Sequence, residues 1–374
     1  MYKRGPQHQS THNKRPLYQT LLSAALLLGA AVFFLTLLAP DPTEPDIPLI
    51  VGAAPPGDFS YTISGDTITI TGYTGANGDV EIPAEIDGVV VRIIGERAFQ
   101  DKTKLTGITI PNSVTSIGQS AFYGCSGLSD LIIPDGVTSI GDAAFFYCYR
   151  LTNIMIPDSV TEIGDRAFDS CSSLATITIS SNITSIGAGV FLNCYCLTSI
   201  IIPDSVTNIS DEAFFGCAGL TSIIIPNSVV NIGSSAFRDC SRLTSIIIPD
   251  SVISIDNWAF DGCSSLTSIT IPDSVTSIGR EAFNRCSLLT SIIIPDSVIS
   301  IGHSAFSECP SLTSITIPDG VTSIGAYTFR FCTSLTSITI PDSVTSIGSC
   351  AFGGCTAMTD IVIPDSVTTC MSRP

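Results

Sequence analysis

Residues 266–288 read LTSITIPDSVTSIGREAFNRCSL, and this stretch decides the fold because variants of it recur along the chain. Phenylalanine marks the recurrence, with a constant spacing of 23 residues and no insertion. A fixed period of this length is typical of solenoid proteins, in which each repeat forms one coil. The phenylalanines of this register are Phe99, Phe122, Phe145, Phe168, Phe191, Phe214, Phe237, Phe260, Phe283, Phe306, Phe329 and Phe352.

The first half of the repeat predicts a strand and a turn. The run from Leu266 to Ile271 is β-branched and alternates at its end, which favours a short strand. Pro272 ends the strand because proline has no N–H to donate to a ladder. We expect the Asp273 side chain to cap nearby backbone N–H groups and so to turn the chain.

The second half returns the chain to the next strand. Val275 and Ile278 are expected to point inward, and Gly279 to permit a second tight bend. Ala282 and Phe283 predict a short helical or 3-10 turn, with Cys286 facing the interior.

No repeat can bury its apolar face alone, so neighbouring repeats must stack. Stacking at about 4.8 Å joins their strands into one parallel sheet and lines up the buried side chains in rows. The sequence therefore predicts a solenoid with a parallel β-sheet on its concave face and short helical or 3-10 turns on the other side.

Composition excludes several classes of function. The chain has 374 residues and a formal charge of −17, whereas a nucleic-acid-binding protein needs basic surface. His8, His12 and His303 are the only histidines, and two of them precede the repeats, which argues against an imidazole metal site or catalytic triad. Gly-rich phosphate loops and CxxC motifs are absent. We expect no enzyme activity, cofactor or metal.

Eleven of the 14 cysteines share one register, three residues after phenylalanine. Stacked side chains point in the same direction, so these residues are interpreted as reduced, buried thiols. The off-register candidates for disulfides are Cys194 with Cys196 and Cys350 with Cys355. The register contains Cys125, Cys148, Cys171, Cys194, Cys217, Cys240, Cys263, Cys286, Cys309, Cys332 and Cys355.

Aspartate follows the proline in most repeats and forms a second register. Turn capping is one interpretation, since Asn112 and Asn227 occupy the same position; a Ca²⁺ site is the alternative. The register contains Asp135, Asp158, Asp204, Asp250, Asp273, Asp296, Asp319, Asp342 and Asp365.

The N-terminus predicts export and membrane anchoring. Residues 1–16 hold four bases and no acid, and form an expected cytoplasmic tail. Residues 17–39 predict one transmembrane signal-anchor helix, because Leu21 to Leu38 is an uncharged run long enough to cross a bilayer. The alternative is a cleaved signal peptide, which would make the protein secreted. Residues 40–57 are a Pro-rich spacer.

The repeat, with its Ile-Pro, Ile-Gly, Ala-Phe and Cys positions, resembles the BspA-like class of leucine-rich repeats found in surface proteins. The resemblance covers residues 83–369, and residues 58–98 are similar to the β-rich N-terminal capping unit of such arrays. Residues 99–374 then form the leucine-rich repeat solenoid, with a truncated last repeat. Ser180 departs from the pattern by replacing the proline, which suggests a local irregularity.

A candidate binding surface follows from the alternation of each strand. One outward register, between two buried isoleucines, is apolar or hydroxyl-bearing and has no charge, as expected of an interaction site. The alternative is that β-branched residues merely stabilise the strands. This Ile/Thr stripe comprises Ile132, Met155, Thr178, Ile201, Ile224, Ile247, Thr270, Ile293, Thr316 and Thr339.

The leading hypothesis is a cell-surface binding protein, anchored in the cytoplasmic membrane with its repeats outside. The resemblance implies adhesion to a protein ligand, such as an extracellular-matrix or plasma protein (fibronectin or fibrinogen) or another cell-surface protein, or adhesion to other microbes. The alternative is a structural or self-associating envelope rod without a specific ligand.

Overall fold

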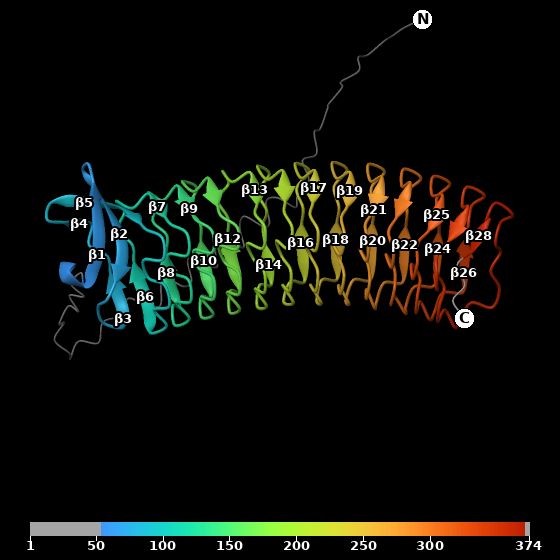
Figure 1. The fold of residues 1–374 in the computed structure, drawn as a ribbon, viewed down its shortest axis with the longest axis horizontal. Helices are drawn as coiled ribbons and strands as arrows, with labels where there is room; N and C mark the ends of the chain where they lie inside the picture. Colours follow the sequence, from blue (N-terminus) through green and yellow to red (C-terminus); the bar gives the residue numbers. More distant parts are fainter. Residues whose placement is uncertain (1–53, 371–374) are drawn as a thin grey trace, which may run out of the picture. The chain divides into compact units, whose positions relative to one another are not determined.

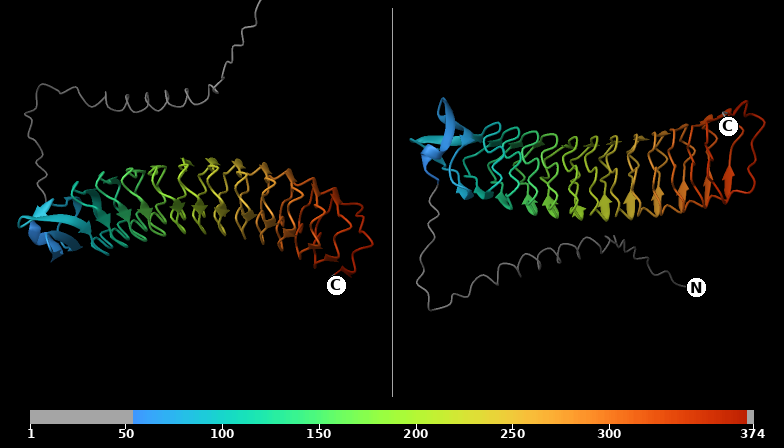
Figure 2. Two further views of the ribbon diagram at one scale, coloured as in Figure 1. Left: turned by 90° about the horizontal axis from the view of Figure 1, so that it is seen from above. Right: turned by 60° about the horizontal axis from the view of Figure 1, so that its bottom comes forward.

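In the computed structural model of the protein, residues 54–370 are described, and they wind into a stack of coils (Figure 1). The stack is curved along its length (Figure 2). Each repeat supplies one strand to a first ladder and a second, shorter strand to another ladder. The predicted solenoid of parallel strands is therefore confirmed.

The first ladder carries the Ile/Thr stripe. Its strands pair in parallel and in register, so that Ile224 lies beside Ile247 and Thr270 beside Ile293. The ladder contains β3 (Gly78–Glu81), β6 (Leu105–Thr109), β8 (Asp130–Ile132), β10 (Asn153–Met155), β12 (Thr176–Thr178), β14 (Ser199–Ile200), β16 (Ser222–Ile224), β18 (Ser245–Ile247), β20 (Ser268–Thr270), β22 (Ser291–Ile293), β24 (Ser314–Thr316) and β26 (Ser337–Thr339).

The second ladder lies where only an inward-pointing segment was expected. Most of its strands are Ser-Ile or Asn-Ile pairs, which are too short for an alternating residue pattern to predict them. Ile278 points inward, as expected. The ladder contains β5 (Val89–Ile94), β7 (Ser116–Ile117), β9 (Ser139–Ile140), β11 (Glu162–Ile163), β13 (Ser185–Ile186), β15 (Asn208–Ile209), β17 (Asn231–Ile232), β19 (Ser254–Ile255), β21 (Ser277–Ile278), β23 (Ser300–Ile301), β25 (Ser323–Ile324), β27 (Ser346–Ile347) and β28 (Thr369–Cys370).

Turns, not helices, form the side of the coil that carries phenylalanine. In one coil the Cys240 N–H donates to the Phe237 C=O (3.2 Å), and Ser235 and Asp239 have φ of 56° and 57°. Equivalent positions in the other coils repeat this left-handed conformation, which interrupts any helix. The expected helical or 3-10 turns are therefore wrong. The Phe237 N–H instead donates to the Ala259 C=O of the next coil (2.9 Å), so this side also links neighbouring coils.

Gly279 serves a different purpose from the expected bend. Its φ is not positive, but a Cβ at this position would lie 2.6 Å from the Asn257 backbone nitrogen of the preceding coil. The glycine therefore permits close approach of two backbones, which sets the stacking distance on this side.

The phenylalanines form a continuous stack through the core. Phe214 and Phe237 have ring centroids 5.3 Å apart and nearly parallel planes (3°), and both side chains are fully buried. Phe260 continues the stack at 5.6 Å. The alignment expected from the 23-residue spacing is confirmed.

The cysteine register packs beside the phenylalanines as free thiols. The Cys240 Sγ donates to the Phe214 C=O of the preceding coil at 3.2 Å. Burial raises the pKa of the Cys125 and Cys332 thiols to about 12, so they stay protonated and able to donate. The interpretation as reduced core residues is confirmed, and both off-register cysteine pairs are also free.

The N-terminal part of the described chain closes one end of the stack. A 3-10 helix, η1 (Pro56–Asp58), leads into an antiparallel hairpin of β1 (Phe59–Ser64) and β2 (Thr67–Tyr73). Strand β2 pairs in parallel with β5, to which the short β4 (Glu85–Ile86) is also paired. The Tyr73 ring stacks on Phe99, which continues the aromatic row into the first coil.

The predicted membrane anchor lies outside the described residues. Within residues 54–370, no helix has the length and apolar character needed to cross a bilayer. The basic tail, the transmembrane segment 17–39 and most of the spacer 40–57 therefore stay predictions, as do the domain boundaries drawn from the sequence.

Candidate functional site

The Ile/Thr stripe projects into solvent from the first ladder. Its isoleucines and Met155 are between 70% and 80% exposed, whereas the flanking isoleucines, such as Ile223 at 4%, face the core. The four threonines of the stripe, Thr178, Thr270, Thr316 and Thr339, are also exposed. The structure thus places all ten predicted residues on one surface, with apolar side chains that have no packing partner.

The aspartate register borders this stripe, but it does not cap the turns as expected. All nine side chains are exposed, and among residues 54–370 only Asp158 accepts hydrogen bonds, from the Ser181 N–H (2.9 Å) and hydroxyl (3.0 Å). These bonds hold the pKa of the Asp158 carboxyl below its usual value. The neighbouring serine joins the coils instead, since Ser274 Oγ donates to the Val252 C=O at 2.6 Å.

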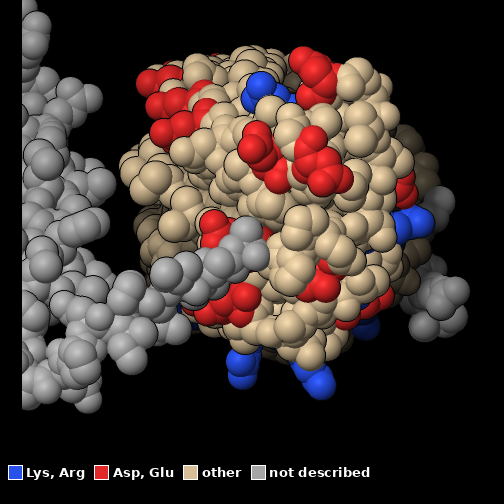
Figure 3. Space-filling view, turned by 90° about the vertical axis from the view of Figure 1, so that its left-hand side faces the viewer, with Lys and Arg blue, Asp and Glu red and all other residues tan. Residues whose placement is uncertain are grey.

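Among residues 54–370, none of these nine aspartates forms a salt bridge. No lysine or arginine lies in a strand of the first ladder, and from Leu105 to Cys370 the arginines are Arg150, Arg166, Arg238, Arg242, Arg280, Arg285 and Arg330. Acidic side chains also gather over the end face formed by the N-terminal strands (Figure 3). Among residues 54–370 no group of three metal-ligating side chains occurs, so nothing in that part favours the calcium alternative.

The surface that carries the stripe is hollowed beside the repeat in which serine replaces proline. A hollow of about 750 Å³ is lined by residues of β8, β10 and β12 and by the turns after them, including Ile132, Asp135, Met155, Asp158 and Thr178. We call it the Met155 hollow. A smaller one of about 270 Å³ adjoins it and shares Asp158 and Thr178.

Both ladders are interrupted near this hollow. Strands β8 and β10 do not pair, and neither do β11 and β13. In the irregular turn, Ser180 Oγ donates to the Val160 C=O (2.6 Å) and the Asn182 side chain donates to the Asp158 C=O (2.7 Å). One coil further, the buried Ser205 hydroxyl has no hydrogen-bond partner. The replacement of one proline thus changes the hydrogen bonding over two coils.

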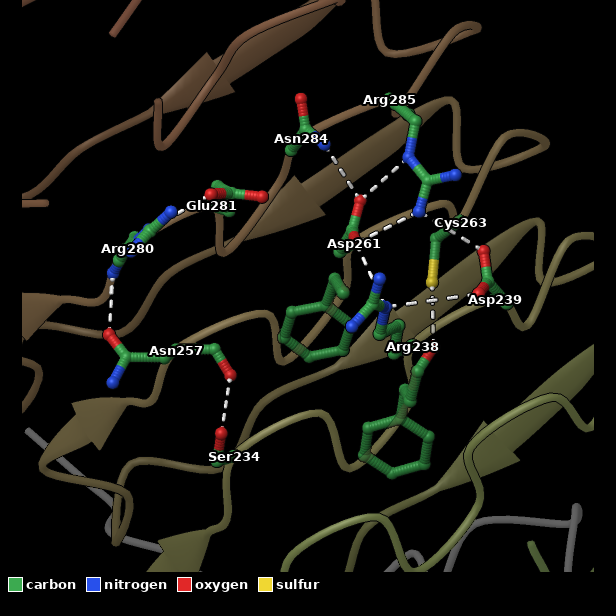
Figure 4. A network of polar contacts seen from close by, with 12 residues as sticks. Ser234, Arg238, Asp239, Asn257, Asp261, Cys263, Arg280, Glu281, Asn284 and Arg285 are labelled. Carbon is green, nitrogen blue, oxygen red and sulfur yellow. Dashed lines mark hydrogen bonds and ion pairs between the residues drawn. The ribbon is translucent and has the colours of Figure 1, made fainter. Parts of the chain in front are cut away.

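A polar network on the opposite side has a structural role. The Asp261 carboxylate, 1% exposed, receives two hydrogen bonds from Arg285 (3.0 and 2.9 Å) and one from Asn284 (2.9 Å), and Arg238 Nε lies 3.0 Å away. These side chains converge on Asp261 from three successive coils (Figure 4). The carboxylate is fully engaged, so the network joins coils and leaves no acceptor for a ligand.

The aromatic residues on the phenylalanine side of the coils mostly pack on their neighbours. Tyr123 stacks on Phe146 at 5.2 Å, and Arg280 lies over the Trp258 ring at 5.5 Å. Packing along the ridge therefore accounts for them. His303 is similarly occupied, because its Nδ1 accepts a hydrogen bond from the Ala326 N–H at 3.0 Å.

Sequence reasoning found the stripe but missed the hollow. The one sequence feature near the hollow that stood out was Ser180, which was interpreted only as a local irregularity. The shape of the hollow depends on how three neighbouring coils pack against one another, which a residue pattern cannot specify.

The comparisons with known proteins agree with this geometry. The family described as "BspA type Leucine rich repeat region" matches residues 92–221, 207–333 and 299–373. A leucine-rich cell surface protein from Faecalibacterium prausnitzii has a similar structure (TM-score 0.61), with 36% identity over 86% of this chain and 95% of its own. A leucine-rich repeat protein from Bacteroides ovatus has a TM-score of 0.65, with 28% identity over 85% of this chain and 98% of its own.

A third similar structure, the pneumococcal vaccine antigen PcpA, shares the fold at 22% identity, with a TM-score of 0.52 over 83% of this chain and 91% of its own. A search of curated proteins finds no significant match to the sequence. The matched family spans most of the chain, and its repeats coincide with the coils of the structure. The chain belongs to the BspA-type leucine-rich repeat family.

Proposed function

We propose that the protein is a membrane-anchored cell-surface adhesion protein whose Ile/Thr stripe binds a protein partner. The observation that carries the proposal is the row of apolar side chains, 70–80% exposed, along strands that contain no lysine or arginine. Soluble proteins rarely leave such a continuous apolar surface without a partner. The similar cell surface protein of Faecalibacterium prausnitzii supports the location.

The stripe is tested by charge substitution at its centre. Ile224→Lys with Ile247→Lys places two charges in the interface but leaves the core untouched, because both side chains are about three-quarters exposed. Binding to immobilised fibronectin, fibrinogen and other matrix proteins, measured by surface plasmon resonance, should weaken at least about tenfold, or about 1.4 kcal/mol.

A matched control uses isoleucines outside the stripe. Ile253 and Ile299 are 57% and 63% exposed and lie beside the second ladder. The Ile253→Lys, Ile299→Lys variant should bind as the parent does. Equal loss in both double variants, or unchanged binding in the stripe variant, would move the site away from the stripe.

The anchor is tested separately. The full chain should resist carbonate extraction from membranes, and deletion of residues 1–39 should release it, because the apolar run from Leu21 to Leu38 would supply the membrane affinity. Release of the full chain by carbonate would instead favour the cleaved, secreted form.

A self-associating rod is the second candidate function. It is favoured by the last described coil, in which Val362 is 81% and Ile363 44% exposed. Light scattering separates the two candidates: the adhesion proposal expects a monomer at micromolar concentration, whereas growth of the particle with concentration would favour the rod.

A further inference from the structure

The Met155 hollow differs from the rest of the stripe in ways that point to a particular ligand. Elsewhere most strands of the first ladder pair with both neighbours, and at its second interruption, between β14 and β16, a single bridge from Ile201 to Ile224 still joins the coils. Here the pairing between β8 and β10 is missing, and a concave space of about 750 Å³ opens between them. That volume lies within the range of roughly 300–1,000 Å³ typical of ligand sites.

The floor and the rim of the hollow have different chemistry. Ile132, Met155 and Thr178 present aliphatic carbon and sulfur, while Asp135 and Asp158 present carboxylates. Neither aspartate forms a salt bridge within the described chain, and no lysine or arginine lies in a strand of the first ladder. The rim therefore holds two negative charges that no residue among 54–370 pairs with in a salt bridge.

One kind of side chain complements both parts. Lysine and arginine have long aliphatic stems that pack on apolar surface, and cationic heads that bind carboxylates. An acidic ligand would be repelled by the rim, and a purely apolar one would leave the carboxylates beside a desolvated surface.

We propose that the Met155 hollow binds an arginine or lysine side chain of the protein partner, with the stem on Met155 and the head between Asp135 and Asp158. The proposal rests on the proposed function and deepens it, because it names the residue chemistry that the partner brings to the stripe. It also assigns the irregular repeat a purpose: the Ser181 bonds hold Asp158 Oδ1 in a fixed position at the rim.

The methionine methyl group provides a direct test. The chain has four methionines, and Met155 alone lines the hollow, while Met358 serves as an internal reference. Methyl-labelled methionine in the full chain is observed by NMR, and Met155→Leu assigns the signal. The probes are blocked tripeptides Gly-Xaa-Gly with arginine, citrulline, leucine or glutamate at the centre. Citrulline matches the size of arginine but carries no charge.

The arginine peptide should shift the Met155 signal in a saturable manner, and the citrulline and glutamate peptides should not. Asp135→Asn with Asp158→Asn should lower the affinity about tenfold, as expected for two exposed ion pairs of up to about 0.7 kcal/mol each. The fold tolerates this change, since asparagine occupies the same register at Asn112 and Asn227. The control Asp273→Asn, Asp296→Asn should leave the affinity unchanged.

Several outcomes would overturn the proposal: no saturable shift with the arginine peptide, equal shifts with citrulline or leucine, or an unchanged affinity in the Asp135, Asp158 variant. These outcomes are independent of the proposed function, because Ile224 and Ile247 lie outside the hollow. Loss of matrix binding in the stripe variant together with an unresponsive Met155 signal would retain the adhesive stripe and reject the cationic pocket.

Discussion

Replacing one phenylalanine of the central stack should destabilise the solenoid in proportion to the number of neighbours lost. Phe237 is fully buried, with ring centroids 5.3 Å from Phe214 and 5.6 Å from Phe260. Phe237→Ala removes the ring and leaves a cavity between two coils that are fixed by backbone hydrogen bonds on three sides. Because those bonds prevent collapse, we expect a loss near the upper end of the usual range, about 4–5 kcal/mol.

Two further variants separate burial from stacking. Phe237→Leu keeps most of the buried apolar area but loses both stacked pairs, which are worth about 0.5–1.5 kcal/mol each, so about 1–3 kcal/mol should be lost. Phe352 is only partly buried and stacks on Phe329 alone, at 5.6 Å. Phe352→Ala should therefore cost about half as much as Phe237→Ala.

Urea unfolding followed by circular dichroism and by the fluorescence of Trp258, the sole tryptophan, measures these losses. Trp258 lies two residues before Phe260 and reports on the coil next to the mutation. If Phe237→Ala loses no more stability than Phe352→Ala, then neighbouring coils do not share one core. The stacking account would then be refuted, even if the native fold persists.

Other predictions concern the polar atoms of the stack. Cys240→Ala should lose about 0.5–1.5 kcal/mol in urea unfolding, because the Phe214 C=O loses its thiol donor and keeps only the bond from the Cys217 N–H. Cys240→Ser, which keeps a donor, should lose less, and the reverse order would contradict this role. Burial raises the pKa of Asp169 to about 6, above its usual value of 3.8. Between these two pH values the folded protein retains a proton that the unfolded chain releases. The free energy of unfolding therefore falls as the pH rises from about 3.8 to about 6. Asp169→Asn should therefore raise the melting temperature at about pH 7.5 and change it little at about pH 4, whereas an equal rise at both pH values would exclude the carboxylate as the cause. At the same register Asp261→Asn should lower the melting temperature at neutral pH, because it weakens the ion pairs with Arg285 and Arg238.

The repeat predicted the core well, because each buried position follows from a spacing of 23 residues. Once Phe237 is stacked on Phe214, the thiol of Cys240 and the isoleucines of the strand have little freedom in where they point. The stripe was predictable for the same reason, since residues on either side of an exposed position in a strand face the core.

Elements that depend on backbone conformation were less predictable. The Ala-Phe segment was expected to be helical, yet left-handed residues such as Ser235 and Asp239 close turns there, and neither residue type requires that conformation. Asp273 was expected to cap a turn, but the neighbouring Ser274 supplies the hydrogen bond between coils. In both cases the local sequence permits more than one conformation or hydrogen-bond donor. Contacts with the neighbouring coil determine which conformation forms and which side chain donates.

The coils are nearly identical, so the position of a bound partner along the array must be fixed by a coil that differs from the others. A partner that bound only the Ile/Thr stripe could shift by one coil and find nearly the same surface, because Ile224 and Ile247 present equivalent environments. Such degeneracy favours avidity but does not fix one bound position. A feature that breaks the uniformity must fix it, and the Met155 hollow, which adjoins the repeat that contains Ser180, is such a feature. We therefore expect the partner to bind the Asp135, Asp158 variant still, but in several positions that differ by one coil. Crosslinking from an engineered cysteine beside the stripe would then give several crosslinked products, where the parent gives one.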